Sequence, residues 1–240
     1  MSRDRSDPRI SITKFAEYLV TITSGRRRSI LTDQRFPPAF KATKFRAAYG
    51  PITDILVGGG DPGLVDEQIA AWRRRNPVSK FQAECLALCI DGLSAFKKVL
   101  QSGALKGLTF APGLADAHVE LGGVKISVRP EVLIAGPEIG AVKIYLSKTN
   151  PLTKDGVGKL GSAGFAAAAL HLWAEEAFGG APAERCLVVD VFAGEVYRAS
   201  SRNATRRKHM LAACEEIAAV WPSLKSPPTA PPPAIAGGAP

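Results

Sequence analysis

The apolar residues of the first hundred positions recur at the spacing typical of helices. In residues 11–23, Ile12, Phe15 and Leu19 fall on one side, so an amphipathic helix is expected there. Residues 78–101 carry the longest apolar stripe, which predicts a buried helix that forms the spine of this half. The stripe consists of Phe81, Cys85, Leu88, Cys89, Leu93, Phe96 and Leu100.

Shorter helices are expected between these two. One should begin at the arginines of positions 26–28 and run to residue 30, and another should cover residues 40–49 and stop at Gly50 and Pro51. A third, over residues 65–75, should end before Pro77, because a proline disfavours helical backbone in the residue that precedes it.

From residue 105 the apolar period changes from helical to alternating, which is typical of strands. Strands are expected around Val119 and Leu121, over residues 124–128 and over residues 142–146. Glycine-containing turns at 122–123 and 136–140 separate them, so a meander is predicted. A helix over 162–178, strands over 186–192 and 196–197, and a helix over 201–220 should follow.

The predicted fold class is therefore α+β, with a helical N-terminal half packed on a small mixed β-sheet flanked by helices. This pattern divides the chain into a helical region, residues 1–104, a core with a C-terminal helix, residues 105–221, and a proline-rich tail, residues 222–240. The tail has few large apolar side chains to offset chain entropy, so it is expected to be disordered with polyproline II character.

The composition fits a folded domain, because 46% of the 240 residues are hydrophobic. Four cysteines lie inside apolar stretches and are expected to be reduced and buried: Cys85, Cys89, Cys186 and Cys214. No apolar run approaches the roughly 20 residues that cross a bilayer, and the first residues are charged. The sequence thus predicts a cytoplasmic protein without a membrane segment.

The formal net charge of +9 adds a candidate partner. The basic residues gather in three groups, which are Arg26, Arg27 and Arg28; Arg73, Arg74 and Arg75; and Arg206, Arg207 and Lys208. Such groups attract phosphate backbones through counterion release, so they predict contact with nucleic acid, most simply DNA. They are also typical of solvated helix ends.

Two familiar motifs are incomplete. Gly158 and Lys159 lack the glycine five positions before them and the Ser or Thr after them that a phosphate-binding loop needs. The spacing of His118 and Glu120 matches the first half of a zinc deaminase signature, but the sequence has no Pro-Cys-x-x-Cys to complete it. Neither motif therefore predicts a site.

The next constellation is more informative. Glu131 follows Pro130 at the end of one predicted strand, and Lys143 lies near the start of the next. Alternate positions share a face of a strand, so Lys143 can face the same site as Glu131. This order resembles the PD-(D/E)XK nuclease superfamily, in which an acid after a proline and an Asp/Glu-x-Lys on the following strand surround divalent metal ions. Without a metal, the same two residues predict a cross-strand ion pair.

The resemblance implies a restriction-endonuclease-like core and a metal-dependent phosphodiesterase. Catalytic roles would fall to Glu131, Lys143 and Glu120, and Mg²⁺ or Mn²⁺ would be held by Glu131, Glu120, Asp190 and His118. The opening helix followed by arginines is similar to the entry helix of the RecB-like branch, and His171 stands near the place of its Gln-x-x-x-Tyr motif.

The sequence also departs from this pattern. Ala141 stands where the superfamily has the acid of Asp/Glu-x-Lys, and the Gln-x-x-x-Tyr motif is not preserved. Two hypotheses remain open. The chain is either a nuclease-like, DNA-processing protein with a degenerate active site, or a non-catalytic module that binds nucleic acid or a protein partner through the Tyr145 face and the proline-rich tail.

Overall fold

The computed structural model describes residues 4–37, 44–148 and 161–226. Its N-terminal region is helical, with five α-helices among the described residues and one short strand before them. These elements are β1 (Arg9–Ser11), α1 (Ile12–Val20), α2 (Ser24–Arg35), α3 (Arg46–Val57), α4 (Pro62–Arg73) and α5 (Lys80–Gln101).

Strands dominate the rest of the chain, and helices flank them. The strands are β2 (Thr109–Pro112), β3 (His118–Leu121), β4 (Val124–Ser127), β5 (Val132–Ala135), β6 (Gly140–Tyr145), β7 (Cys186–Asp190) and β8 (Glu195–Arg198). The helices are α6 (Ser162–Phe178), α7 (Ala204–Val220) and the short 3₁₀ turns η2 (Ala183–Arg185) and η3 (Trp221–Ser223). The protein is thus of the α+β class, as the sequence predicts.

The described strands form two sheets. A mixed five-stranded sheet has the order β2-β5-β6-β7-β8, in which β6 and β7 are parallel and the other neighbours antiparallel. The connection between the two parallel strands contains α6. A three-stranded sheet has the order β1-β4-β3, so the strand at the very start of the chain pairs with one more than a hundred residues later.

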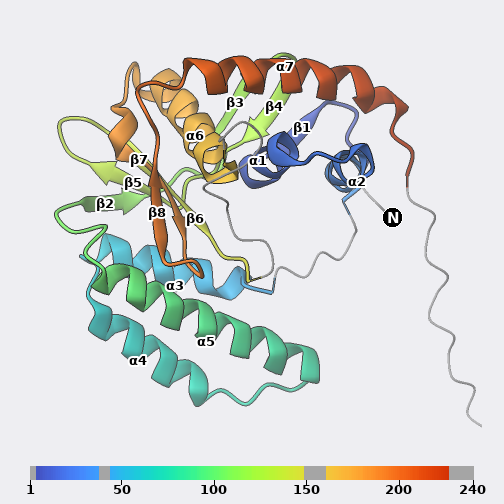
Figure 1. Ribbon diagram of the computed structural model, residues 1–240. Coiled ribbons are helices and arrows are strands. Elements are labelled where there is room, and N and C mark those ends of the chain that lie inside the picture. Colours follow the sequence, from blue (N-terminus) through green and yellow to red (C-terminus); the bar gives the residue numbers. More distant parts are fainter. Residues whose placement is uncertain (1–3, 38–43, 149–160, 227–240) are drawn as a thin grey trace, which may run out of the picture.

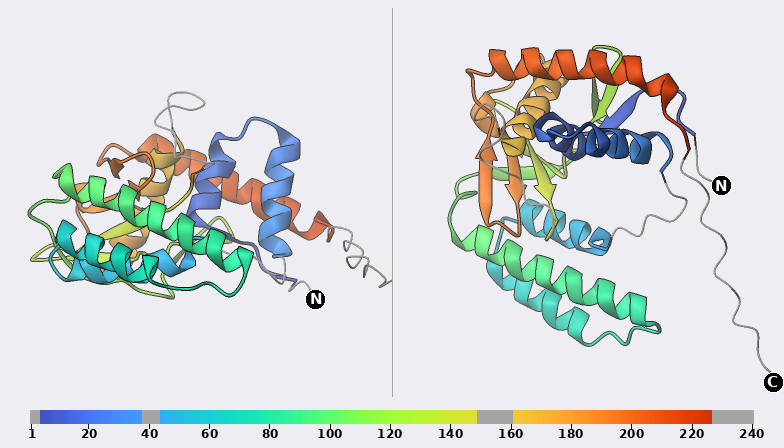
Figure 2. Two further views of the ribbon diagram at one scale, coloured as in Figure 1. Left: turned by 90° about the horizontal axis from the view of Figure 1, so that it is seen from below. Right: turned by 45° about the vertical axis from the view of Figure 1, so that its right-hand side comes forward.

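Helices cover both faces of the five-stranded sheet (Figure 1). Helices α3, α4 and α5 lie below it, while α1 and α6 lie above it, beside α7 and the small sheet. Alternate residues of β6 divide between two apolar cores: Val142 and Ile144 pack with the α3–α5 layer, and Ala141 packs with α1 and α6. Figure 2 shows the α4–α5 hairpin as an outer layer from two further directions.

The structure places α1 and α2 differently from the other N-terminal helices. Phe15 and Ile30 share a core with α6 and α7, whereas Ile52 and Phe96 share one with the opposite face of the sheet. The two groups of helices therefore cover opposite faces of the sheet.

The predicted meander is wrong. Residues 142–146 do not pair with 124–128, because β5 intervenes and pairs with β6 in the other sheet. Two backbone features end β4 and redirect the chain: Arg129 has a positive φ of 45° and Pro130 lacks an N–H. The short apolar run of β5 gave no long alternating pattern from which to identify it.

Two helix predictions also need correction. Pro51 lies inside α3, which continues to Val57, because Ile52, Ile55 and Leu56 bury their side chains on the sheet side. Phe81, predicted to be buried in α5, is 42% exposed, since the first half of this helix extends beyond the core. Residues 40–43 of the predicted helix over 40–49 lie outside the described residues.

Most other elements agree with the sequence. The predicted helix over 162–178 is α6, and Gly179 ends it with a left-handed φ of 68°. The incomplete motif at Gly158 and Lys159 and most of the proline-rich tail lie outside the described residues, although Leu224 near the start of the tail is buried. Within residues 4–37, 44–148 and 161–226, no helix is long and apolar enough to cross a membrane.

Candidate functional site

Glu131 and Lys143 meet across the β5–β6 hairpin. Val132 of β5 lies opposite Val142 of β6 in an antiparallel pair. Glu131, which precedes Val132, is therefore the neighbour of Lys143, which follows Val142. Lys143 Nζ donates to Glu131 Oε1 at 2.7 Å, and the Ile144 backbone N–H donates to Oε2 at 2.6 Å. The two side chains are only 13% and 14% exposed. Both carboxylate oxygens are therefore engaged by donors from the protein itself.

Burial governs the chemistry of this carboxylate. Desolvation raises the pKa of Glu131, and the Lys143 ammonium and the Ile144 N–H partly oppose this shift. Tyr49 of α3 lies near the pair, and its pKa is raised first by its own burial and then by the negative charge of Glu131. The site is thus a desolvated ion pair with a protonated tyrosine nearby.

Ala141 lies on the same face of β6 as Lys143, two residues earlier. Its neighbours across the sheet are Leu133 of β5 and Cys186 of β7, and its side chain is completely buried in the core with α6. The position of the missing acid is therefore filled by apolar packing.

Asp190 shares this face of the sheet, at the end of β7 and opposite Tyr145. Its side chain is fully buried, and its Oδ1 accepts a hydrogen bond from the Ala193 N–H at 3.1 Å. Burial raises the pKa of Tyr145, and the negative charge of Asp190 adds to the effect. This carboxylate closes the β7–β8 turn, so it too already has a partner within the protein.

The other predicted metal ligands lie elsewhere. Glu120 and His118 belong to β3 in the three-stranded sheet, where both are exposed and the His118 ring contacts the Asp116 carbonyl at 2.9 Å. Within the described ranges, no three His, Cys, Asp or Glu side chains are placed to hold a metal ion together. Of the predicted ligands, Glu131 is the one that lies next to Lys143. A single carboxylate does not fit a Mg²⁺ or Mn²⁺ site, which requires several converging oxygens.

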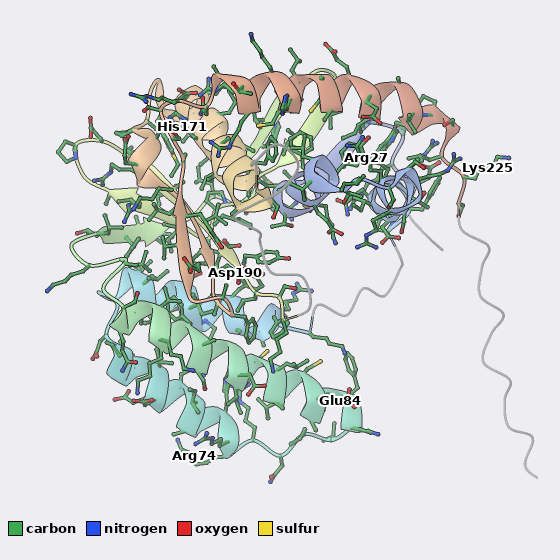
Figure 3. The ribbon with its side chains drawn as sticks, viewed as in Figure 1. Arg27, Arg74, Glu84, His171, Asp190 and Lys225 are labelled. Carbon is green, nitrogen blue, oxygen red and sulfur yellow. The ribbon has the colours of Figure 1, made fainter. Side chains whose placement is uncertain are left out.

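His171 has a structural environment. Its Nε2 lies 2.9 Å from the Ala181 carbonyl, and its Nδ1 lies 3.2 Å from the side-chain amide of Asn203. Figure 3 shows His171 on α6 well away from Asp190. This ring therefore joins α6 to the start of α7 and does not face the ion pair.

A basic groove does lie beside the ion pair. We use this name for two adjoining cavities of about 310 and 390 Å³ that share Ser127 and Arg129 as lining residues. The smaller cavity is also lined by Arg9, Lys125 and His118, and the larger by Lys14, Lys143 and Tyr145. Asp116 is the single acidic residue among the described residues that line the groove.

The cations of the smaller cavity form few ion pairs among the described residues, although Lys125 lies opposite Glu120 across the β3–β4 pair. Arg9 faces Lys125 across the parallel pair of β1 and β4, and His118 faces Ser127 across the antiparallel pair of β3 and β4. In the part of the chain that the structure describes, no carboxylate forms an ion pair with Arg9, Lys125 or Arg129. By contrast, Lys14 in the larger cavity pairs with Glu17 at 2.6 Å.

Arg129 joins the groove to the ion pair. Its carbonyl accepts a hydrogen bond from Lys143 Nζ at 2.8 Å, and Arg129 is a lining residue of both cavities. It is the one non-glycine residue with a positive φ in the described ranges. Backbone of this kind costs about 1–3 kcal/mol and concentrates at functional sites. The strained backbone of Arg129 therefore lies where the two cavities meet.

Most of the arginines predicted to bind nucleic acid are engaged within the protein. Arg26 pairs with Glu17 at 2.5 Å, and Arg27 lies over the Tyr18 ring and donates to the Thr21 carbonyl.

The cluster of Arg206, Arg207 and Lys208 lies beside α6. Arg207 pairs with Glu175, and the Arg206 guanidinium lies against α6 so closely that a Cβ on Gly164 would come within 2.9 Å of it. Arg28 and Lys208 remain exposed without an ion pair in the described ranges. The two clusters thus serve mainly to join helices.

Four basic residues of the groove were missed because no two of them are adjacent in the sequence: Arg9, Lys14, Lys125 and Arg129. One local signal was available, since β4 alternates buried Val124 and Ile126 with the outward residues Lys125 and Ser127. Arg9 could not be found in this way, because its place depends on a pairing between β1 and β4 that no local pattern encodes.

No protein-family model matches this sequence, and no curated protein matches it significantly.

Proposed function

We propose that this chain is a nucleic-acid-binding protein on a nuclease-like core, and that it binds the phosphate backbone through the basic groove without a catalytic metal. The observation that carries the proposal is the position of Arg129, whose carbonyl accepts a hydrogen bond from Lys143 and which lines both cavities. Lys and Arg side chains without internal partners are the groups that neutralise phosphates and release counterions.

The nuclease-like core is part of the same proposal. Glu131 after Pro130 and Lys143 on the following strand meet in space, as the resemblance to the PD-(D/E)XK superfamily requires. The second acid is replaced by the buried Ala141, and the oxygens of Glu131 already accept hydrogen bonds from the protein. We therefore infer that the hairpin keeps its architecture and that the chemistry is lost.

The experiment measures binding of a fluorescein-labelled 20-nucleotide DNA, single-stranded and duplex, by anisotropy in EDTA over a salt series. Wild-type protein is compared with Arg9→Gln, Lys125→Gln and Arg129→Asn. Arg74→Gln serves as the matched control, because Arg74 is exposed after α4, far from the groove (Figure 3), and its loss changes the net charge equally.

Each groove substitution should weaken binding and reduce the slope of log K against log salt by about 0.7–0.9 for each phosphate that is no longer neutralised, while Arg74→Gln should leave both unchanged. Equal weakening in all four variants, or binding that ignores salt, would overturn the groove as the interface. The same DNA is then incubated with Mg²⁺ and with Mn²⁺. Cleavage that disappears in Glu131→Gln would replace this proposal with a metal-dependent nuclease.

A further inference from the structure

A cavity of about 680 Å³ lies in the α3–α5 layer. It is bounded by the residues that begin α3, the end of α4 and the first half of α5. These three ends converge on the side where α5 begins, at the lower right of Figure 1. The volume is within the range of about 300–1,000 Å³ that is typical of small-molecule sites.

The cavity wall is apolar because the stripe of α5 continues beyond the core. Cys89, Leu93 and Phe96 are buried. Cys85 and Phe81, which lie one turn and two turns before Cys89 on the same face of α5, line the cavity. Phe81 is 42% exposed, which is unusual for a large side chain on the same face of a core helix. The stripe therefore presents apolar surface to the cavity.

The rim of this cavity is positively charged. Lys44, Arg46 and Arg75 are the ionised residues that line it, all three are exposed, and no carboxylate pairs with them in the described ranges. Arg75 is held above the ring of Trp72, with its guanidinium carbon 5.6 Å from the ring centroid. A ligand that fits this wall and rim combines an apolar body with a negatively charged head.

We propose that this cavity binds a small amphiphilic anion, in which an acyl chain or aromatic ring carries a carboxylate, phosphate or sulfonate. The apolar part would lie against Phe81 and Leu86, and the anionic head would contact Arg46 and Arg75. The two sites share no lining residue, although α3 contributes Arg46 to this cavity and Tyr49 to the groove.

Cys85 provides a native reporter of occupancy, since it lines the cavity and is partly exposed. The test uses the full chain and two twelve-carbon probes below their micelle-forming concentrations: dodecanoate, and the cation dodecyltrimethylammonium as the matched probe of opposite charge. One readout is the rate at which a maleimide alkylates Cys85. The other is displacement of the fluorescent aromatic sulfonate 1-anilinonaphthalene-8-sulfonate.

Dodecanoate should slow alkylation of Cys85 and displace the sulfonate, with a Kd at least about tenfold lower than that of the cation, because one charge-assisted hydrogen bond is worth about 1.4 kcal/mol or more. Arg46→Gln and Arg75→Gln should each reduce this preference, and Arg74→Gln should not. Near-ultraviolet circular dichroism confirms that each variant keeps its tertiary packing.

Three results would overturn the proposal. The first is equal protection by both probes, which indicates an apolar patch without anion selectivity. The second is sulfonate binding that survives both arginine substitutions. The third is a Cys85 that does not react in the ligand-free protein, which shows that another part of the chain fills the cavity.

Discussion

Replacing Lys143 with methionine removes the ammonium group that faces the buried carboxylate of Glu131. Breaking one side of a buried ion pair costs about 3–5 kcal/mol, and the slight exposure of this pair lowers our expectation to about 2–4 kcal/mol at pH 7. For a chain of 240 residues, this corresponds to a fall in Tm of about 4–16 °C.

The destabilisation should depend on pH in a defined direction. Burial raises the pKa of Glu131 above its ordinary value of 4.5, and Lys143 opposes that shift, so Lys143→Met raises the pKa further. A carboxyl whose pKa is higher in the folded state binds its proton more tightly there. Its contribution is therefore fully present below the unfolded pKa and is lost as pH rises through the folded pKa. The variant should be close to wild type at about pH 4.5 and fall progressively behind it toward about pH 8.

Urea unfolding followed by tryptophan fluorescence, repeated at several pH values, measures both effects. Lys148→Met is the matched control, because Lys148 pairs with Asp91 at 2.6 Å on the surface, where the side chains are 43% and 53% exposed. That variant should lose less than about 1 kcal/mol at any pH. A Lys143→Met protein within about 0.5 kcal/mol of wild type at pH 7, or one whose deficit does not change with pH, would refute the reasoning.

Three further outcomes are expected. Arg129→Asn should weaken DNA binding without lowering the unfolding free energy, because asparagine tolerates a positive φ; a clear fall in Tm would contradict this. Phe96→Ala should cost about 3–5 kcal/mol in urea unfolding, since its ring is completely buried, and an unchanged midpoint would remove it from the core. Maleimide at neutral pH should label Cys85 first, whereas Cys186 and Cys214, whose thiol pKa burial raises to about 12, should react after unfolding; rapid labelling of all would contradict their burial.

Local patterns predicted the helices well because each helix makes its own hydrogen bonds. The α6 boundaries follow from an alanine-rich apolar segment and a terminal glycine, both of which are visible in the sequence. The stripe of α5 was also correct in period, but it could not show that the first two turns, with Phe81, extend beyond the sheet. Burial depends on neighbours that are distant in the chain.

Strand pairing was harder to predict for the same reason. The β3–β4 hairpin is local, and its glycine turn and alternation predicted it. The parallel pairing of β6 with β7 spans the whole of α6, and β1 pairs with a strand from the middle of the chain. Such pairings are decided by the total burial that they achieve, and no short window of sequence contains that information.

In the candidate site, too, contacts between adjacent strands could be predicted, and positions that depend on distant strands could not. Glu131 and Lys143 come from adjacent strands, so their contact could be anticipated from spacing and alternation alone. Glu120 and Asp190 were predicted to join them as metal ligands, but Glu120 belongs to β3 of the small sheet and Asp190 to the end of β7. Arg129 was hidden by its conformation, because a positive φ at a non-glycine residue has no reliable sequence signature.

The ion pair and the groove are physically connected, and this connection bears on the purpose of the pair. Lys143 binds Glu131 with one hydrogen bond and the strained Arg129 carbonyl with another, so the same ammonium that closes the hairpin also holds the backbone of the groove's central arginine. A residue in a sparsely populated conformation persists only where its surroundings fix it. A nuclease would need the carboxylate of Glu131 for a metal, whereas in this structure the carboxylate accepts a hydrogen bond from the ammonium that also binds the Arg129 carbonyl. Under the proposed function, Lys143 is therefore a positioning residue for phosphate binding, because it holds the backbone of Arg129.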